Sequence, residues 1–96
     1  MVHYLKLKKI NFIKSWHADR KHNVEKYEAE AVFWNDPFYR RSREIHGETR
    51  YLALGETDEG RYLVVVYEII SATEILLITA RDMEPEERRQ YVKRRG

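Results

Sequence analysis

The chain has 96 residues, a length typical of one folded domain, and we expect residues 1–96 to form a single domain. It contains no cysteine, which excludes disulfides, thiolate metal sites and cysteine nucleophiles. No apolar run approaches the roughly 20 residues that a membrane span needs, and the basic N-terminus lacks the apolar block of a signal peptide. We therefore expect a cytoplasmic protein that makes no membrane contact.

The charged residues are distributed unevenly, although the formal net charge is only +2. Lysine and arginine outnumber acids seven to two in residues 1–26, and they also prevail in residues 37–55 and 75–96. Residues 56–74 hold one arginine and five acids. A fold that joins the basic regions would have a positive face suited to a polyanion. A dense surface network of ion pairs explains the same counts equally well.

The N-terminal quarter has the pattern of a strand followed by a short helix. Residues 5–13 alternate imperfectly between apolar and basic side chains, which predicts a strand exposed on one face. Ser15 can cap a helix over residues 16–22, because its hydroxyl can accept a free backbone N–H. Asn23 is a suitable end for that helix, since asparagine tolerates the left-handed conformation.

A second helix is predicted over residues 25–34 and is ended by Asn35-Asp36-Pro37, because the residue before proline avoids helical geometry. Val24, Tyr27, Ala31 and Trp34 recur at helical spacing and predict the buried face, with Val32 beside them. The charged residues of this segment are expected to face away from the core; they are Glu25, Lys26, Glu28 and Glu30.

The segment from residue 38 to residue 81 reads as a sheet. Short, turn-rich connections predict an antiparallel meander, with a glycine turn at residues 57–60 and a loose connection at residues 69–73. The third strand is apolar on both faces and is therefore expected to be central, and the last has the same character. The four predicted strands are Phe38–Arg43, Arg50–Gly55, Arg61–Tyr67 and Glu74–Ala80.

Pro85, at a first helical position, and the acids after it predict a C-terminal helix to about residue 94. Its apolar side chains are Tyr91 and Val92 alone, so it should dock weakly on the sheet. The predicted fold class is therefore α+β: an N-terminal strand, two short helices, a four-stranded antiparallel meander and a C-terminal helix.

Several kinds of site are excluded by their missing motifs. His17 and His22 lie about 140° apart around a helix and do not share a face as a zinc pair would, and His3 and His46 have no ligand-like neighbours. The chain has no phosphate-binding loop, no dinucleotide fingerprint and no serine with an evident base. We predict neither a metal site nor a cofactor.

Arginine, lysine and histidine side chains remain as candidates, and metal-free RNA cleavage needs little more. A base takes the proton of the 2′-hydroxyl, an acid protonates the leaving 5′-oxygen, and fixed cations hold the charge on phosphorus. His22 is the candidate acid or base, and Lys21, Arg50 and Arg81 are the candidate cations. Candidates for holding flanking phosphates are Arg61, Arg88 and Arg89, and candidates for stacking a base are Tyr51, Trp16, Trp34 and Tyr39.

Each of these residues also has a purely structural explanation. Lys21 and His22 suit the negative end of a helix dipole, and Arg81 can pair with Asp82 or a nearby glutamate. Trp34 and Tyr51 are the residue types that most often belong to a core. The arginines of the first meander strand, Arg40, Arg41 and Arg43, can protect a sheet edge from pairing with other chains.

Four segments together resemble the BrnT family: KHNV at 21–24, EAEAVFWNDP at 28–37, RYLALGETDEGRYLVVVY at 50–67 and ITARDMEPEERRQY at 78–91. BrnT proteins are ribonuclease toxins of type II toxin–antitoxin modules. The resemblance implies a RelE-like fold, metal-free RNA cleavage that inhibits translation, and neutralisation by a cognate antitoxin. It leaves open whether the chain forms a dimer or a toxin–antitoxin hetero-oligomer.

The motifs of the family fall on particular positions of this chain. Its Lys-His-Gly-Val falls on residues 21–24, with Asn23 in place of glycine, and its Arg-Tyr falls on Arg50 and Tyr51. The segment between Trp16 and Lys21 is shorter than is usual in the family. The remaining matches are Gly60 and Arg61, Thr79 to Arg81, and Glu87, Arg88 and Tyr91.

Three functions are therefore considered. The leading hypothesis is a ribonuclease toxin with RNA and an antitoxin as partners. The alternative is a non-catalytic module that binds nucleic acid or protein and has kept the toxin fold. A hydrolase of small phosphorylated substrates is disfavoured, because no phosphate-cradling loop is present.

Overall fold

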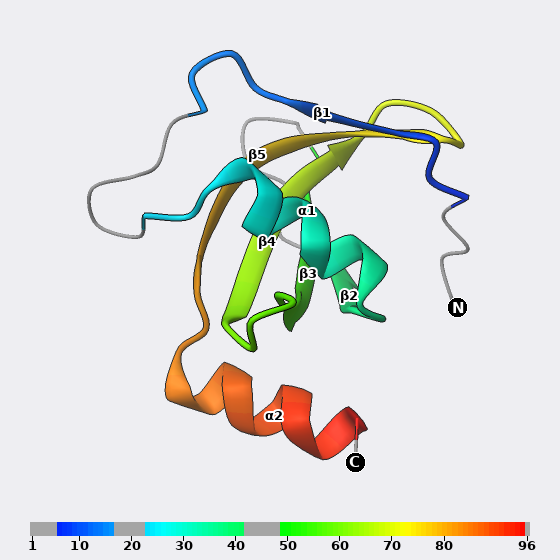
Figure 1. Cartoon of the computed structure of the whole chain (residues 1–96). Coiled ribbons are helices and arrows are strands. Elements are labelled where there is room, and N and C mark those ends of the chain that lie inside the picture. Colours follow the sequence, from blue (N-terminus) through cyan, green and yellow to red (C-terminus); the bar gives the residue numbers. More distant parts are fainter. Residues whose placement is uncertain (1–5, 17–22, 42–48, 96) are drawn as a thin grey trace.

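One five-stranded sheet carries a helix on each of its faces (Figure 1). The computed structural model describes residues 6–16, 23–41 and 49–95. Its strands lie side by side in the order β1-β5-β4-β3-β2, so the predicted α+β class is confirmed. In chain order the elements are β1 (Lys9–Phe12), α1 (Lys26–Trp34), β2 (Phe38–Arg41), β3 (Tyr51–Glu56), β4 (Tyr62–Ile69), β5 (Glu74–Asp82) and α2 (Pro85–Arg95).

The last four strands form the predicted meander, since each pairs antiparallel with the next. β4 is central, as expected of a strand that is apolar on both faces, and β2 is an edge strand. Gly60 takes a φ of 88° in the β3–β4 turn, a conformation that glycine adopts without steric cost.

The N-terminal strand is shorter than predicted and belongs to the same sheet. β1 pairs parallel with β5, and Ile10 lies opposite Ile75. The sheet is therefore mixed, because one parallel strand is added to the antiparallel meander. The Asn11 side-chain amide donates to the carboxylate of Glu74 at 3.2 Å and to the backbone carbonyl of Ile75 at 3.1 Å. These two bonds help to hold the short strand at the edge.

Two predicted features of the connections have different outcomes. The helix expected over residues 16–22 lies, apart from Trp16, outside the described residues, whereas Asn23 has the predicted left-handed backbone, with a φ of 47°. The loose connection expected at residues 69–73 is wrong. Ile69 belongs to β4, and the backbone N–H groups of Ile70 and Ser71 both donate to the carbonyl of Glu74, which closes a tight turn.

The predicted buried face of α1 is right for Val24 and Val32, which are 2% and 0% exposed, but wrong for the stripe of Tyr27 and Trp34. Ala29, Val32 and Phe33 are buried against the sheet, while Tyr27 and Trp34 are 64% and 58% exposed. At about 100° per residue the two stripes lie roughly 170° apart on the helix, and both have helical period.

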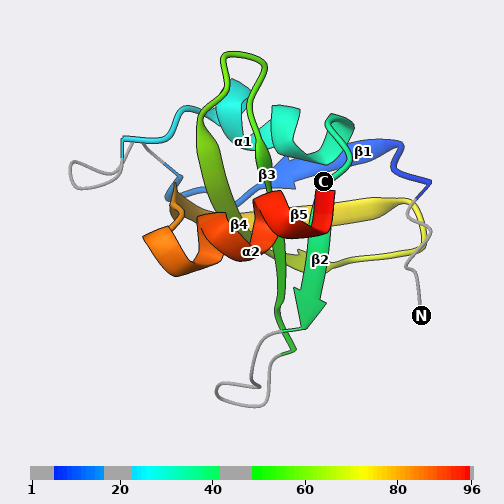
Figure 2. The same ribbon diagram turned by 90° about the horizontal axis from the view of Figure 1, so that it is seen from below.

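Helix α2 covers the other face of the sheet through one anchor. Tyr91 is 1% exposed and packs with Leu54 and Val64, whereas Val92 is 47% exposed. Two arginines of α2 add contacts that the predicted weak docking did not include. The guanidinium carbons of Arg88 and Arg94 each lie 4.2 Å from an aromatic ring centroid of the sheet. Figure 2, seen from below, shows α2 nearest the viewer with α1 behind it. Within the described part of the chain, neither helix has the length and apolar character needed to cross a membrane.

Candidate functional site

Arg81, near the end of β5, is held by a carboxylate from the first turn of α2. Its two terminal nitrogens donate to the two oxygens of Glu87 at 2.7 and 2.8 Å, and one of them also donates to the Asp82 carbonyl at 3.1 Å. Hydrogen bonding to Glu87 raises the pKa of Arg81, and the same contact lowers the pKa of Glu87. The Arg81 side chain is 34% exposed, so the guanidinium is oriented but still reachable from solvent.

A bulge in β5 determines the face on which Arg81 lies. Val66 pairs with Thr79 but Tyr67 pairs with Leu77, so Ile78 is an extra residue on β5. The bulge lets Leu77 point into the core under α1 while Thr79 and Arg81 share the α2 face with Val66 and Val64. Bulges often re-aim side chains beside functional sites in this way.

Arg50 lies on the same face as Arg81, but at the other end of β4. Its Nε lies 3.1 Å from a carboxylate oxygen of Glu68, and the two side chains are 33% and 28% exposed. The strand partner of Arg81 is Val64, four residues before Glu68, so the two arginines are separated by about 13 Å along the strand.

Two further arginines lie on this face and were not among the predicted site residues. Arg40 of β2 is exposed and contributes, after Arg81, to the lowered pKa of Glu87. Arg94 of α2 stacks over the ring of Phe38, also on β2, at 4.2 Å. The sequence signal for Arg40 was present in the basic edge strand, which was explained as edge protection. We call Arg40, Arg50, Arg81 and Arg94 the basic face.

Arg61 lies on the α1 side and is surrounded by acids. Its guanidinium donates to Asp82 at 2.8 and 3.2 Å, to Glu28 at 3.1 and 3.2 Å and to the Asn23 carbonyl at 3.1 Å. The Asp82 hydrogen bond is the largest cause of the raised pKa of Arg61. Glu28 was expected to face solvent, but its side chain is only 13% exposed. This geometry ties α1, the β3–β4 turn and β5 together, which favours a structural role over the predicted phosphate contact.

Tyr51 is likewise on the α1 side, in an aromatic cluster. Its ring stacks on Tyr67 at 5.7 Å, and Tyr67 also meets Phe33 at 5.2 Å and Tyr39 at 6.3 Å. Burial is the main reason why the pKa values of Tyr67 and Tyr39 are raised. This placement matches the core explanation of Tyr51 and separates it from the basic face.

The remaining predicted residues are dispersed. Arg88 stacks over Tyr62 and, with Arg89, lines a hollow of about 440 Å³ on α2 that Met83, Pro85 and Val92 complete. Arg89 pairs with Glu86 at 2.6 Å in the open. Lys21 and His22 lie outside the described residues. Among the residues that are described, no group of three acidic or histidine side chains could hold a metal ion.

An α+β domain with cations on one sheet face is compatible with a protein that acts on RNA, and comparison with known families specifies the class. Residues 12–87 match the family model described as "Ribonuclease toxin, BrnT, of type II toxin-antitoxin system". The match covers most of the chain, which therefore belongs to the BrnT family of ribonuclease toxins. A search of curated proteins gave no match. Membership in a type II toxin–antitoxin family implies a protein antitoxin as partner and RNA as substrate.

Proposed function

We propose that this chain is an active, metal-independent endoribonuclease that inhibits translation and binds RNA across the basic face. The observation that carries the proposal is the Arg81–Glu87 pair, at 2.7 and 2.8 Å. A carboxylate and a phosphate present similar pairs of oxygens to a guanidinium. Glu87 thus holds Arg81 in the geometry that a phosphate needs, and the backbone phosphate of RNA takes the place of the carboxylate when it binds.

The chemistry follows from a fixed cation beside the reacting phosphate. The 2′-oxygen loses its proton to a base and attacks phosphorus, and the bond from phosphorus to the 5′-oxygen breaks. The products are a 2′,3′-cyclic phosphate and a 5′-hydroxyl, and no co-reactant is consumed. We assign Arg81 to the charge on phosphorus, His22 to proton transfer and Lys21 to a second cation. Arg40, Arg50 and Arg94 contact the neighbouring phosphates.

The test is RNA cleavage by the purified chain in EDTA, with the product ends identified. We expect 2′,3′-cyclic phosphate ends, and about a hundredfold or greater loss of rate in Arg81→Ala, the usual scale for removal of one donor at a developing charge. Arg81→Lys, which keeps the charge but not the two parallel bonds, should fall in between. Lys14→Ala is the matched control, because it removes one exposed cation from the turn after β1.

Growth provides the second measurement. Expression of the chain should arrest growth, and Arg81→Ala should relieve the arrest. Intact RNA at high protein concentration, together with normal growth, would contradict the proposal.

A non-catalytic binding module is the second candidate, and one observation favours it. Arg50, Arg61 and Arg81 each contact a carboxylate at 3.1 Å or less, so each already has a structural partner. This function predicts salt-dependent RNA binding with no cleavage, a result that the assay in EDTA distinguishes directly.

A further inference from the structure

The outer face of α1 exposes two large aromatic side chains. Tyr27 and Trp34 are seven residues apart, which is two helical turns, so they lie on one stripe with Glu30 and Ala31 between them. Their exposures of 64% and 58% are the highest of the large apolar side chains in the described residues. Large apolar side chains that are exposed side by side often mark an interaction surface.

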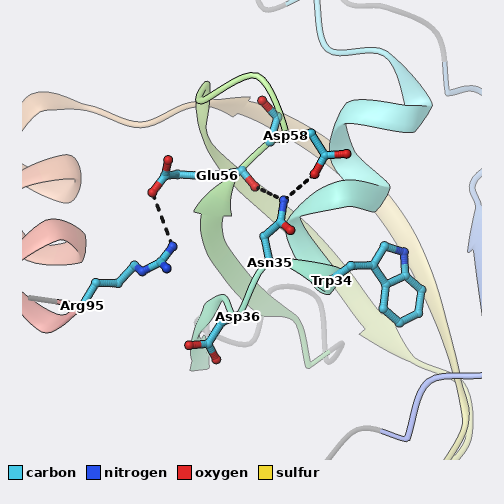
Figure 3. Close-up of a pocket in the computed structure, with 7 residues that line it drawn as sticks. Trp34, Asn35, Asp36, Glu56, Asp58 and Arg95 are labelled. Carbon is cyan, nitrogen blue, oxygen red and sulfur yellow. Dashed lines mark hydrogen bonds and ion pairs between the residues drawn. The ribbon is translucent and has the colours of Figure 1, made fainter.

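The stripe is hollowed on both sides of Trp34. One hollow of about 270 Å³ is lined by Tyr27, Glu30, Ala31, Trp34 and Asp58. A second, of about 390 Å³, is lined by Trp34, Asn35, Asp36, Glu56, Thr57, Asp58 and Arg95 (Figure 3). Trp34 and Asp58 border both, so the two hollows are adjacent, and we call them together the α1 groove.

Asn35 gives the α1 groove a fixed floor. Its side-chain amide donates to the Glu56 carbonyl at 3.0 Å and to a carboxylate oxygen of Asp58 at 3.0 Å, as the dashed lines in Figure 3 show. The two bonds tie the end of α1 to the β3–β4 turn and hold Asp58 near the aromatic stripe. The groove is therefore built before a partner arrives, which lowers the entropic cost of binding.

The charges around the α1 groove select the occupant. Four carboxylates line it, those of Glu30, Asp36, Glu56 and Asp58, against a single guanidinium, that of Arg95. Arg95 lies 3.4 Å from Glu56 and so neutralises part of that charge. An RNA phosphate would be repelled here, whereas an arginine could stack on an indole and reach a carboxylate at the same time.

We propose that the α1 groove is the docking site for a basic, arginine-bearing segment of the cognate antitoxin. The inference rests on the antitoxin partnership of this family and does not depend on whether the chain cleaves RNA. An arginine of that segment stacks on Trp34 and pairs with Asp58, while an apolar neighbour fills the hollow beside Tyr27.

The test is a calorimetric titration of the full chain with its full-length cognate antitoxin. Trp34→Ala should weaken binding about thirtyfold, the scale of an interface hot spot. Asp58→Asn should weaken it about fivefold at low salt and less at high salt, because it removes charge but can still accept the Asn35 hydrogen bond. Both side chains are exposed, so circular dichroism should show unchanged folding.

Two matched controls lie outside the α1 groove. Ile70→Ala removes an exposed apolar side chain from the β4–β5 turn, and Glu59→Gln removes an exposed carboxylate next to Asp58. Both variants should bind the antitoxin as the unmodified chain does. RNA cleavage by Trp34→Ala should also be unchanged, because Trp34 lies among the carboxylates of the α1 groove and not on the basic face, so we no longer expect it to stack an RNA base.

Other outcomes separate this inference from its rivals. Antitoxin binding within twofold of normal in both Trp34→Ala and Asp58→Asn would overturn it. A dimer of the chain alone that Trp34→Ala dissociates would show that a second copy occupies the groove, and weakened RNA binding in Trp34→Ala would assign the groove to RNA. If the chain cleaves no RNA but Trp34→Ala still loses the antitoxin, the docking site stands and the nuclease proposal fails.

Discussion

At the scale of single residues, Glu87 makes two different kinds of contact. It binds Arg81 through both oxygens, and one of these oxygens also accepts the backbone N–H of Glu84 at 2.8 Å, at the start of α2. A carboxylate in the first turn of a helix is also favoured by the helix dipole. The same side chain therefore stabilises α2 and orients the arginine that we assign to catalysis.

The Arg81–Glu87 pair should make stability depend on acid. The Arg81 hydrogen bond holds the pKa of Glu87 below its ordinary value of 4.5, so the ionised form contributes stability above that pH and the contribution is lost as the pH falls through the folded-state pKa. Glu87→Gln should cost about 0.5–1 kcal/mol at pH 7, since the pair is partly exposed. The difference should shrink as the pH falls below 4.5 and vanish once the carboxylate is protonated in the folded state as well.

Denaturant unfolding at several pH values measures this effect. Glu86→Gln is the matched control, because Glu86 pairs with Arg89 in the open. A Glu87→Gln difference that stays constant from pH 7 to pH 3 would count against an ionised pair.

At the scale of secondary-structure elements, helix α2 packs on the sheet with very few buried apolar side chains. Tyr91 is its one buried residue, and Tyr62 lies against it at 5.9 Å between ring centroids. Arginines on either side of it stack on aromatic rings of the sheet, at 4.2 Å each. Arginine stems and guanidinium planes thus cover apolar surface that a count of hydrophobic residues does not include.

Tyr91→Ala should therefore destabilise the fold by about 3 kcal/mol, because it removes a fully buried ring and leaves a cavity. Val92→Ala, next to it but 47% exposed, should change stability by less than about 0.5 kcal/mol. Chemical unfolding followed by circular dichroism gives both values. Similar small losses in the two variants would show that α2 is not anchored by Tyr91.

The sequence predicted the elements better than their contacts. β4 could be predicted because Leu63 to Val66 are apolar in succession, a local signal for a central strand. The buried stripe of α1 could not be predicted, because residues 27, 31 and 34 have the same helical period as Ala29, Val32 and Phe33. The parallel pairing of β1 with β5 joins residues 65 apart, such as Lys9 and Glu74, and no local pattern encodes it.

For the candidate site, the sequence likewise indicated individual residues but not their partners. Arg81 could be singled out because a cation follows a buried strand and precedes a helix start. Its partner Glu87 was anticipated only as a nearby acid. The structural role of Arg61 depends on Glu28, which is 33 residues away, so the pairing was invisible in the sequence. The charge distribution was compatible with a basic face and with an ion-pair network, and the structure contains both. Arg50 and Arg81 lie on one face of the sheet, and each also forms an ion pair with a glutamate.

At the scale of the whole molecule, the two helices separate two kinds of surface. Figures 1 and 2 show α1 and α2 on different faces of the sheet. The acidic α1 groove runs beside α1 and reaches Arg95 at the end of α2, whereas the basic face lies on the α2 side. RNA and a basic antitoxin segment would therefore bind different sides of the molecule. Neutralisation would then need a further part of the antitoxin to reach the basic face, or a change passed through the sheet.

The salt dependence of RNA binding tests this separation. If Arg40, Arg50, Arg81 and Arg94 each contact one phosphate, the logarithm of the binding constant should fall with the logarithm of salt concentration with a slope of about −3, since a single strand contributes about −0.7 per phosphate. A 2′-O-methyl oligonucleotide, which lacks the attacking hydroxyl, measures binding without cleavage. Arg40→Ala should reduce the slope by about 0.7, whereas Asp58→Asn should leave it unchanged. Equal slopes for Arg40→Ala and the unmodified chain would exclude Arg40 as a phosphate contact, because a phosphate contact on β2 cannot be lost without releasing fewer counterions.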